Sequence, residues 1–461
     1  MGTNEKKIIV IGGGIGGYPA ALRAARLGAQ VVLIERDKLG GVCLNWGCVP
    51  TKTLLQSAEI YSTMKRAPSF GVKAESISID FAAMMRRKEG VVRQLTSGVE
   101  KLLKDKKVEI IRGTATFSDQ KTIKIMETGK TIQGDKVIIA TGSVPTKPDI
   151  PGIDGPNIMT SDDILSAKSL PKGVLIIGGG YIGVELGQLL SRLGVRVTIV
   201  EILSHTVPRE DEDVGEALKK RLQEEGIDIY TNSTVEKIEP GKKIATVTYA
   251  TPEGKKTVRV EKVILASGRR PYAEGLGLEK IGVRVDKDGI IVNNRMETNI
   301  PGIYAIGDSI GGIMLAHMAM AEGEYAARNA MGISSEIDYA AVPRCIYSFP
   351  EIGAVGMTEG EARERYNVKV SRFPLHANSK ANILGETHGM VKIIAEEEEG
   401  DILGVHIYSP HATDLISEAV FAMEMEATAE ELAHVIHPHP TLSEALGEAA
   451  QILSGGAIHL P

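Results

Sequence analysis

Two of the three cysteines in the chain lie five residues apart, in the segment GGVCLNWGCVPTK. On a regular α-helix the Cα atoms of Cys43 and Cys48 would be roughly 8–9 Å apart, and a disulfide bond tolerates at most about 7 Å. A disulfide therefore requires a break in the helix, which Asn45 and Gly47 permit. A zinc site is the alternative, but two thiolates need further cysteine or histidine ligands, and no second cysteine pair exists. The spacing favours a redox disulfide over a metal site.

Three histidines lie close together near the end of the chain, in the segment HVIHPHPTLSEA. They could indicate a metal site, but their spacing is irregular, and Pro438 and Pro440 interrupt any helix. The alternative is that one histidine is an acid–base catalyst oriented by Glu444. Thiol–disulfide exchange needs a base because the thiolate, not the thiol, attacks. An imidazole with an unperturbed pKa of about 6.5 suits that role.

The elements that would position this chemistry appear as an internal repeat. Residues 8–35 and 174–201 each read as an apolar strand, a GxGxxG turn, an amphipathic helix, a second strand and an acid. In such a unit the first glycine permits the tight turn, the second lets a pyrophosphate approach the backbone, and the third lets helix and strand pack closely. The pyrophosphate lies at the helix N-terminus, and the acid accepts hydrogen bonds from the ribose hydroxyls. The predicted sites are Gly12, Gly14, Gly17 and Glu35, and Gly178, Gly180, Gly183 and Glu201.

A second pair of similar segments supports this layout. The sequences KVIIATGS (residues 136–143) and KVILASGR (residues 262–269) each predict a buried strand that ends in Ala-Thr-Gly or Ala-Ser-Gly. At such a strand end the backbone can close over a bound dinucleotide. A later strand ends in Gly-Asp at Asp308, before Met314-Leu315-Ala316-His317. An Asp in this position can bind a polyol hydroxyl, although an isolated one is more typical of a turn.

Composition sets the limits of the architecture and the function. A chain of 461 residues, 43% of them hydrophobic, suffices for two to four domains. The net charge of −6 argues against a nucleic-acid partner that needs a broad basic face. Aromatic residues are scarce, at 4%, and there are 51 glycines. That balance favours an α/β protein with many tight strand-to-helix turns over an all-β sandwich.

Cysteine use and the apolar segments bear on the compartment. An odd, low cysteine count argues for a reducing environment. Cys345 stands alone beside Ile346 and is expected to be a buried small hydrophobe. The apolar run after Lys7 gives way to glycines after four residues, too short for a signal peptide. Since no stretch of about 18 apolar residues exists either, we expect a cytoplasmic protein with no membrane span.

Taken in order, these motifs resemble the pyridine nucleotide–disulfide oxidoreductase family. They are the first fingerprint with its acid, the GGxCLNxGCxPTK loop, the second fingerprint, the GD…MLAH segment and the terminal HPTLSE. The resemblance covers the whole chain and implies a homodimeric flavoprotein that uses FAD and NAD. The implied fold class is α/β, with two Rossmann-like dinucleotide-binding domains and a C-terminal α+β dimerisation domain. The expected domains are residues 1–145 (FAD-binding), 146–270 (NAD-binding), 271–339 (central, completing the FAD site) and 340–461 (dimerisation).

The same resemblance implies a role for particular residues. Cys43 resembles the thiol that exchanges with substrate, and Cys48 resembles the thiol that lies against the flavin. His439, directly before Pro-Thr, resembles the catalytic base, held by Glu444. Lys52 and Glu185 resemble an ion pair near the flavin and the nicotinamide. The cofactor-binding positions expected for FAD and NAD together are Gly12, Gly14, Gly17, Glu35, Lys52, Gly113, Ala115, Thr141, Gly142, Ser143, Gly178, Gly180, Gly183, Glu185, Glu201, Gly268, Asp308, Met314, Leu315, Ala316 and His317.

The implied activity is the reoxidation of a dihydrolipoyl group with reduction of NAD. The lipoyl group would be carried by an acyltransferase or hydrogen-carrier protein of a 2-oxoacid dehydrogenase or glycine-cleavage complex. A mercuric-reductase-like activity would need a C-terminal cysteine pair, and no cysteine follows Cys345. Glutathione-reductase-like proteins prefer NADP, which Glu201 disfavours. A non-catalytic scaffold protein would be expected to lack the cysteine pair or His439. Tyr272 stands where many relatives carry Asn, which leaves the inter-domain contact at that position open.

Overall fold

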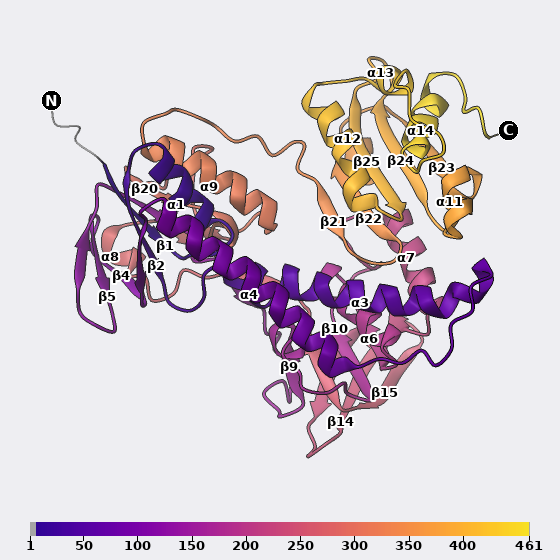
Figure 1. Ribbon diagram of the computed structural model, residues 1–461, viewed down its shortest axis with the longest axis horizontal. Coiled ribbons are helices and arrows are strands. Elements are labelled where there is room, and N and C mark those ends of the chain that lie inside the picture. Colours follow the sequence, from indigo (N-terminus) through magenta and orange to yellow (C-terminus); the bar gives the residue numbers. More distant parts are fainter. Residues whose placement is uncertain (1–5, 461) are drawn as a thin grey trace. The chain divides into compact units, whose positions relative to one another are not determined.

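The computed structural model describes residues 6–460, and the chain divides into two compact units (Figure 1). The first unit holds residues up to Lys147, Met159–Leu170 and Gly268–Asp338. The second unit holds Pro148–Ile158, Pro171–Ser267 and the chain from Tyr339 onward. Among the helices of the described part of the chain, none is long and apolar enough to cross a membrane.

A five-stranded parallel sheet is the framework of the first unit. Its strands, in spatial order, are β20 (Ile303–Ala305), β7 (Lys136–Ile139), β1 (Lys7–Ile11), β2 (Gln30–Glu35) and β3 (Glu109–Arg112). These strands are nearly continuous apolar runs, as expected for a parallel sheet that is covered on both faces. Its helices are α1 (Gly17–Arg26), α2 (Gly41–Asn45), α3 (Cys48–Arg66), α4 (Phe81–Asp105), α8 (Leu278–Ile281) and α9 (Ala316–Ala330).

Small residues allow α1 and α9 to pack closely. A Cβ atom on Gly323 of α9 would lie 2.5 Å from the carbonyl oxygen of Gly16, just before α1. The other face of the sheet is covered by an antiparallel meander whose Phe117, Ile123 and Ile125 join the core beneath β1 and β2. Its strands are β4 (Ala115–Asp119), β5 (Thr122–Ile125) and β6 (Thr131–Gln133).

The second unit begins with the same layout. Its parallel strands run in the order β12 (Asp228–Tyr230), β11 (Arg196–Val200), β10 (Gly173–Ile177) and β16 (Lys262–Leu265). Helices α6 (Tyr181–Arg192) and α7 (Glu212–Glu224) accompany them, and a meander of β13 (Thr234–Glu239), β14 (Ala245–Thr251) and β15 (Gly254–Val260) packs on the sheet. The repeat read in the sequence is therefore a repeat of structure.

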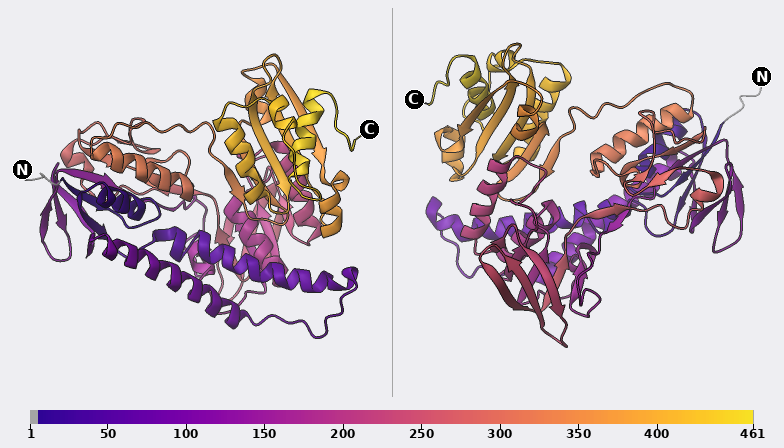
Figure 2. Two further views of the ribbon diagram at one scale, coloured as in Figure 1. Left: turned by 45° about the horizontal axis from the view of Figure 1, so that its top comes forward. Right: turned by 180° about the vertical axis from the view of Figure 1, so that it is seen from behind.

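The C-terminal part of the second unit is an antiparallel sheet with helices packed on it (Figure 2). The strands, in spatial order, are β21 (Arg344–Ile346), β22 (Glu351–Gly356), β25 (Ile402–Ser409), β24 (Met390–Glu396) and β23 (Val368–Pro374). The accompanying helices are α10 (Glu359–Arg363), α11 (Ser379–Leu384), α12 (Ala412–Glu424), α13 (Ala429–Ala433) and α14 (Glu444–Ser454). This mixed α/β architecture confirms the fold class predicted from the sequence.

Shorter elements connect these layers. They are β8 (Ser143–Pro145), β9 (Ile158–Thr160), α5 (Ser161–Ile164), β17 (Arg269–Pro271), β18 (Val285–Asp286), β19 (Gly289–Ile290) and the 3₁₀ turns η1 (Ala67–Phe70), η2 (Gly307–Ile310) and η3 (Leu375–Ala377).

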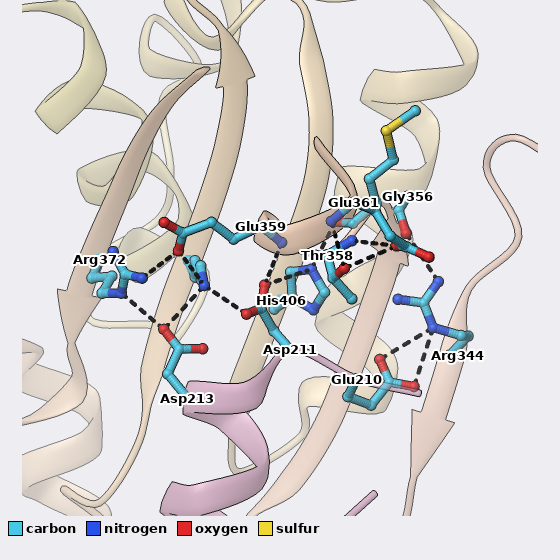
Figure 3. A network of polar contacts seen from close by, with 12 residues as sticks. Glu210, Asp211, Asp213, Arg344, Gly356, Thr358, Glu359, Glu361, Arg372 and His406 are labelled. Carbon is cyan, nitrogen blue, oxygen red and sulfur yellow. Dashed lines mark hydrogen bonds and ion pairs between the residues drawn. The ribbon is translucent and has the colours of Figure 1, made fainter. Parts of the chain in front are cut away.

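A buried ion network fastens the C-terminal sheet to the start of α7 within the second unit (Figure 3). The side chain of Lys392 is 1% exposed, and its Nζ lies 2.9 Å from Asp211, 3.0 Å from Asp213 and 2.8 Å from Glu359. Arg372 bonds two of these carboxylates as well. Although the three acids are close enough together to hold a cation, they converge on this ammonium. Removing one partner of such a buried pair leaves an uncompensated charge.

Two groups of this network have strongly shifted pKa values. Burial lowers the pKa of His406 to about 4, and its Nε2 lies 3.0 Å from the carbonyl oxygen of Met357. Burial alone would raise the pKa of Glu359, but hydrogen bonds from Lys392 and Arg363 lower it to about 2. His406 is therefore neutral and Glu359 ionised in the folded protein at neutral pH.

We predict that these groups make the second unit sensitive to acid. As the pH falls from about 6.5 to about 4, the unfolded chain protonates His406 before the folded protein does, so this part of the stability is lost in that window. The stability from Glu359 is present above pH 4.5 and is lost as the pH falls toward 2. His406→Gln should therefore lose less unfolding free energy than the parent between pH 6.5 and 4.5, by roughly 2–3 kcal/mol.

The measurement is the urea-unfolding midpoint at the two pH values, followed by circular dichroism. The exposed His434 supplies the control, because His434→Gln should follow the parent. Equal losses in the parent and in His406→Gln would contradict the assignment.

Candidate active site: a cysteine pair and two dinucleotide turns

The two cysteines lie on different helices. Cys43 is inside the short helix α2, and Cys48 is the first residue of α3. Between them the helix is broken at Trp46 and Gly47, where Gly47 has φ −131° and ψ −112°. A Cβ atom on Gly47 would lie 3.1 Å from the carbonyl oxygen of Val42 and 3.4 Å from the Cα atom of Cys43. The break that the spacing required is present, and it brings the two thiols into a hydrogen bond.

Side chains on either side of the break hold its backbone. The Asn45 amide donates to the carbonyl oxygens of Leu39 (3.0 Å) and Gly41 (2.9 Å). The Thr51 hydroxyl donates to the carbonyl oxygen of Gly47, at 2.7 Å. The Gly47 carbonyl oxygen also accepts the Thr51 N–H at 3.1 Å, so these side-chain bonds add to the backbone bonds that fix the loop on both sides of the break.

The two thiols differ in their electrostatic surroundings. The hydrogen bond to Cys48 and then burial raise the pKa of Cys43, while the Lys52 ammonium opposes this shift. Cys48 begins a helix of 19 residues, and the dipole of that helix favours an anion at this end. The hydrogen bond to Cys48 and burial thus disfavour negative charge on Cys43, and the helix dipole favours it on Cys48.

The first dinucleotide turn lies directly against this loop. A Cβ on Gly12 would be 2.2 Å from the carbonyl oxygen of Ala140, and one on Gly17 would be 1.8 Å from that of Gly12. Packing therefore requires both glycines. At Gly14 the nearest atom to such a Cβ is the Cα of Gly41, at 3.8 Å. The backbone at Gly14 is thus open to a pyrophosphate, as an FAD site needs.

The second turn repeats this arrangement. A Cβ on Gly178 would be 2.4 Å from the carbonyl oxygen of Ala266, and one on Gly183 would be 1.9 Å from that of Gly178. A Cβ on Gly180 would meet nothing within 4 Å. Both turns therefore have two glycines fixed by packing and a middle one that leaves the backbone accessible.

The acids that end the two units are also equivalent. The Glu35 carboxylate accepts hydrogen bonds from the backbone N–H groups of Gly13 and Asp37, each at 2.7 Å. Glu201 accepts those of Gly179 (2.5 Å) and Leu203 (2.8 Å). Each carboxylate is buried beside its turn, within reach of the backbone that would hold a dinucleotide, which fits a ribose-binding role.

Further residues of the expected FAD site lie together in the first unit. The Ser143 hydroxyl donates to Asp308 at 2.5 Å, which joins the start of β8 to the 3₁₀ turn η2 after β20. Arg269 donates to the same hydroxyl at 2.8 Å and to the Ser143 carbonyl oxygen at 2.9 Å. We did not predict a role for Arg269. The available signal was the similarity of KVIIATGS and KVILASGR, which aligns Ser143 with Arg269.

The remaining expected cofactor positions also have defined places. The Thr141 hydroxyl donates to the carbonyl oxygen of Tyr272 at 2.5 Å, and the Tyr272 N–H donates to that of Gly142. The Arg36 guanidinium lies 4.4 Å from the centre of the Tyr272 ring. The other positions in this unit are Lys52 on α3, Gly113 before β4, Ala115 in β4, Gly268 before β17, Met314 and Leu315 before α9, and Ala316 and His317 at its start.

The expected base and its partner lie in the second unit. His439 Nδ1 is 2.8 Å from Glu444 Oε1, and the other oxygen of Glu444 accepts the Thr441 N–H at 2.8 Å. Burial would raise the pKa of Glu444, but these hydrogen bonds lower it. The His439 side chain is 69% exposed, so it can be reached from outside this unit.

Some expected neighbours belong to different units. Glu185 is buried in the second unit, and its carboxylate accepts the Tyr347 N–H at 3.0 Å. Lys52 and the cysteines belong to the first unit. The ion pair between Lys52 and Glu185, and the approach of His439 to the cysteines, therefore stay predictions. Cys345 packs against the C-terminal core, as expected of a small hydrophobe, but it is only partly buried, so the expectation that it is buried was wrong.

Comparisons with known proteins agree with this geometry. A family model described as pyridine nucleotide-disulphide oxidoreductase matches residues 6–323, and one described as the dimerisation domain of that family matches residues 342–450. A dihydrolipoyl dehydrogenase of Bacillus subtilis (strain 168) is 44% identical over 457 residues, covering 98% of this chain and 99% of the relative. One from Thermus scotoductus is 44% identical over 459 residues and 98% of each chain.

Solved structures show the same similarity. LpdA from Mycobacterium tuberculosis aligns with a TM-score of 0.88 at 28% identity, over 97% of this chain and 99% of that one. The HOCl-induced flavoprotein disulfide reductase RclA from Escherichia coli aligns with a TM-score of 0.86 at 29% identity, over the same shares. Sequence and fold thus agree along nearly the whole chain, which belongs to the pyridine nucleotide-disulphide oxidoreductase family.

Proposed function

We propose that the protein oxidises carrier-bound dihydrolipoyl groups to lipoyl disulfides and passes the electrons through FAD to NAD. The observation that carries the proposal is the Cys43–Cys48 thiol pair, which the helix break holds against an open dinucleotide turn. The 44% identity to dihydrolipoyl dehydrogenases supports this choice of substrate. In balance, one dithiol and one NAD⁺ give one cyclic disulfide, NADH and a proton.

The steps follow from the chemistry of thiols. His439, oriented by Glu444, takes the proton from one substrate thiol. The resulting thiolate attacks Cys43 of the oxidised pair and expels Cys48 as a thiolate. The second substrate thiol then attacks the substrate sulfur in the mixed disulfide, which releases the lipoyl disulfide and leaves Cys43 reduced. FAD supplies the transfer of the electron pair from the dithiol to the nicotinamide.

Each nucleotide has its own turn in this proposal. Residues 1–145 bind FAD through the first turn and Glu35, and the central residues 271–339 complete that site with Asp308. Residues 146–270 bind NAD through the second turn, Glu201 and Glu185. Residues 340–461 form the homodimer, in agreement with the dimerisation-domain match.

The proposed setting follows from the substrate. The partners are lipoyl-bearing acyltransferases or hydrogen-carrier proteins of a 2-oxoacid dehydrogenase or glycine-cleavage complex. We place the protein in the cytoplasm, where a reducing environment would keep Cys345 as a thiol.

The first test is the reaction itself. The purified flavoprotein should reduce NAD with dihydrolipoamide far faster than it reduces glutathione disulfide with NADPH. Cys43→Ser and Cys48→Ser should each lower the dihydrolipoamide activity by at least about a thousand-fold, because each removes one sulfur of the exchange. Cys345→Ser is the matched control and should keep nearly full activity. Faster turnover of glutathione disulfide would reject the proposed substrate.

The second prediction concerns the choice of nucleotide. The Glu201 carboxylate can accept the ribose hydroxyls of NAD but repels a 2′-phosphate. The next three residues, Ile202 to Ser204, offer no cation to offset that repulsion. The parent should prefer NAD over NADP in kcat/KM by about a hundred-fold, and Glu201→Ala should reduce this preference about ten-fold. The exposed Glu253 is the control position. A parent enzyme that used both nucleotides equally would contradict the assignment.

The third prediction is that each active site combines two subunits, with the cysteines from one and His439 and Glu444 from the other. Cys48→Ser and His439→Gln homodimers should each be nearly inactive. A mixed dimer of the two variants would contain one site with both defects and one intact site, so substantial activity should return. Verified mixed dimers as inactive as their parents would place base and disulfide on the same chain.

A further inference from the structure

A second histidine–carboxylate pair lies on the helix that carries Glu444. His459 Nδ1 is 2.6 Å from Glu448 Oε1. The other oxygen of Glu448 accepts the N–H groups of Ile458 (3.0 Å) and His459 (3.2 Å). Glu448 is itself 8% exposed, so this buried carboxylate holds the tail with both of its oxygens.

The tail that carries His459 is folded back along α14. Gly455 and Gly456 follow the helix with φ of +147° and +118°, conformations that suit glycine. The Gly456 N–H donates to the carbonyl oxygen of Gln451, one turn back in the helix. Beyond His459, Leu460 packs on the hydrophobic core of the C-terminal sheet. The tail is thus fixed at three points: the turn, Glu448 and Leu460.

The two histidine–carboxylate pairs are neighbours. Glu444 and Glu448 are four residues apart on α14, so they lie on the same face of the helix, about 6 Å apart along its axis. His439 bonds the first carboxylate and His459 the second, each through Nδ1. The two imidazoles therefore bind carboxylates on consecutive turns of α14, although neither histidine belongs to that helix. Their side chains are 69% and 64% exposed.

The charges around Glu444 are few. Burial would raise its pKa, but the Thr441 N–H, His439 and, at longer range, His459 lower it. His437 also lies near the Glu444 carboxylate. The Nε2 atom of His437 is 2.7 Å from Glu418, and this second carboxylate offsets the charge of the His437 ring. Glu448 is the remaining carboxylate, and it is paired with His459. His459 is thus the titratable group near Glu444 that the tail supplies.

We propose that His459, held in place by Glu448, is a positioning residue for the pair of His439 and Glu444. When protonated, His459 stabilises the carboxylate that orients His439 and opposes a positive charge on His439. The C-terminal tail thereby becomes part of the acid–base apparatus. This inference rests on the proposed role of His439 as the base.

The test is a pH titration of His439 in the full-length holoenzyme, followed by NMR of ¹³C-labelled histidine rings. His459→Gln removes a partner that can carry positive charge beside Glu448, so the midpoint of the His439 titration should rise by about half a pH unit. The acid limb of the pH profile of kcat/KM should move by the same amount. His459→Lys restores a cation and should bring both midpoints back. The exposed His434 is the control position, and His434→Gln should leave both midpoints unchanged.

The outcomes separate the inference from the function on which it rests. An unchanged or lowered His439 midpoint in His459→Gln would overturn the inference, whatever the activity. So would a rise that His459→Lys fails to reverse, because loss of packing would then explain it. Full activity in His439→Gln would instead reject His439 as the base. In that case the NMR midpoints would still report whether the two pairs are coupled.

Discussion

The close backbone contact between the cysteine loop and the first dinucleotide turn is the constraint on which the site depends. The Gly40 N–H donates to the carbonyl oxygen of Gly13 at 2.8 Å, and a Cβ on Gly41 would lie 2.7 Å from the Cα of Gly14. Helix α2, which carries Cys43, therefore starts on the turn that would hold the pyrophosphate. A side chain at either contact would separate the two. The same backbone that would hold the nucleotide thus sets the position of the thiols.

The second unit shows what the shared scaffold does without this loop. Its turn has the same packing at Gly178 and Gly183, and Glu201 makes the same two backbone bonds as Glu35. After Glu201, however, the chain continues with the exposed apolar residues Ile202 and Leu203, and no cysteine pair follows. The same βαβ unit therefore appears twice, and the two copies differ in the cysteine loop that follows only the first.

Features encoded within short segments could be predicted from the sequence. The glycine turns, their acids and the helix break between the cysteines each depend on residues within about thirty positions of one another. The features that were missed join distant segments. Arg269 reaches Ser143 across 126 positions, and Lys392 reaches Asp213 across 179. In the sequence Lys392 looks like an ordinary polar residue of a strand, and no neighbouring residue indicates that it is buried. The prediction that Cys345 is buried was wrong for a related reason. An apolar neighbour in the sequence does not determine which face of a strand is covered.

The position at which α3 begins gives the two cysteine sulfurs different electrostatic surroundings. Because Cys48 is the first residue of that helix, its sulfur lies at the positive end of the helix dipole. Cys43 lies within the other helix, and its pKa is raised by the hydrogen bond to Cys48 and by burial. In thiol–disulfide exchange the sulfur that better carries negative charge is the better leaving group. In the proposed reaction, an attacking thiolate would therefore favour Cys43 and expel Cys48. The break at Trp46 and Gly47 does more than let two sulfurs meet, because it makes them unequal.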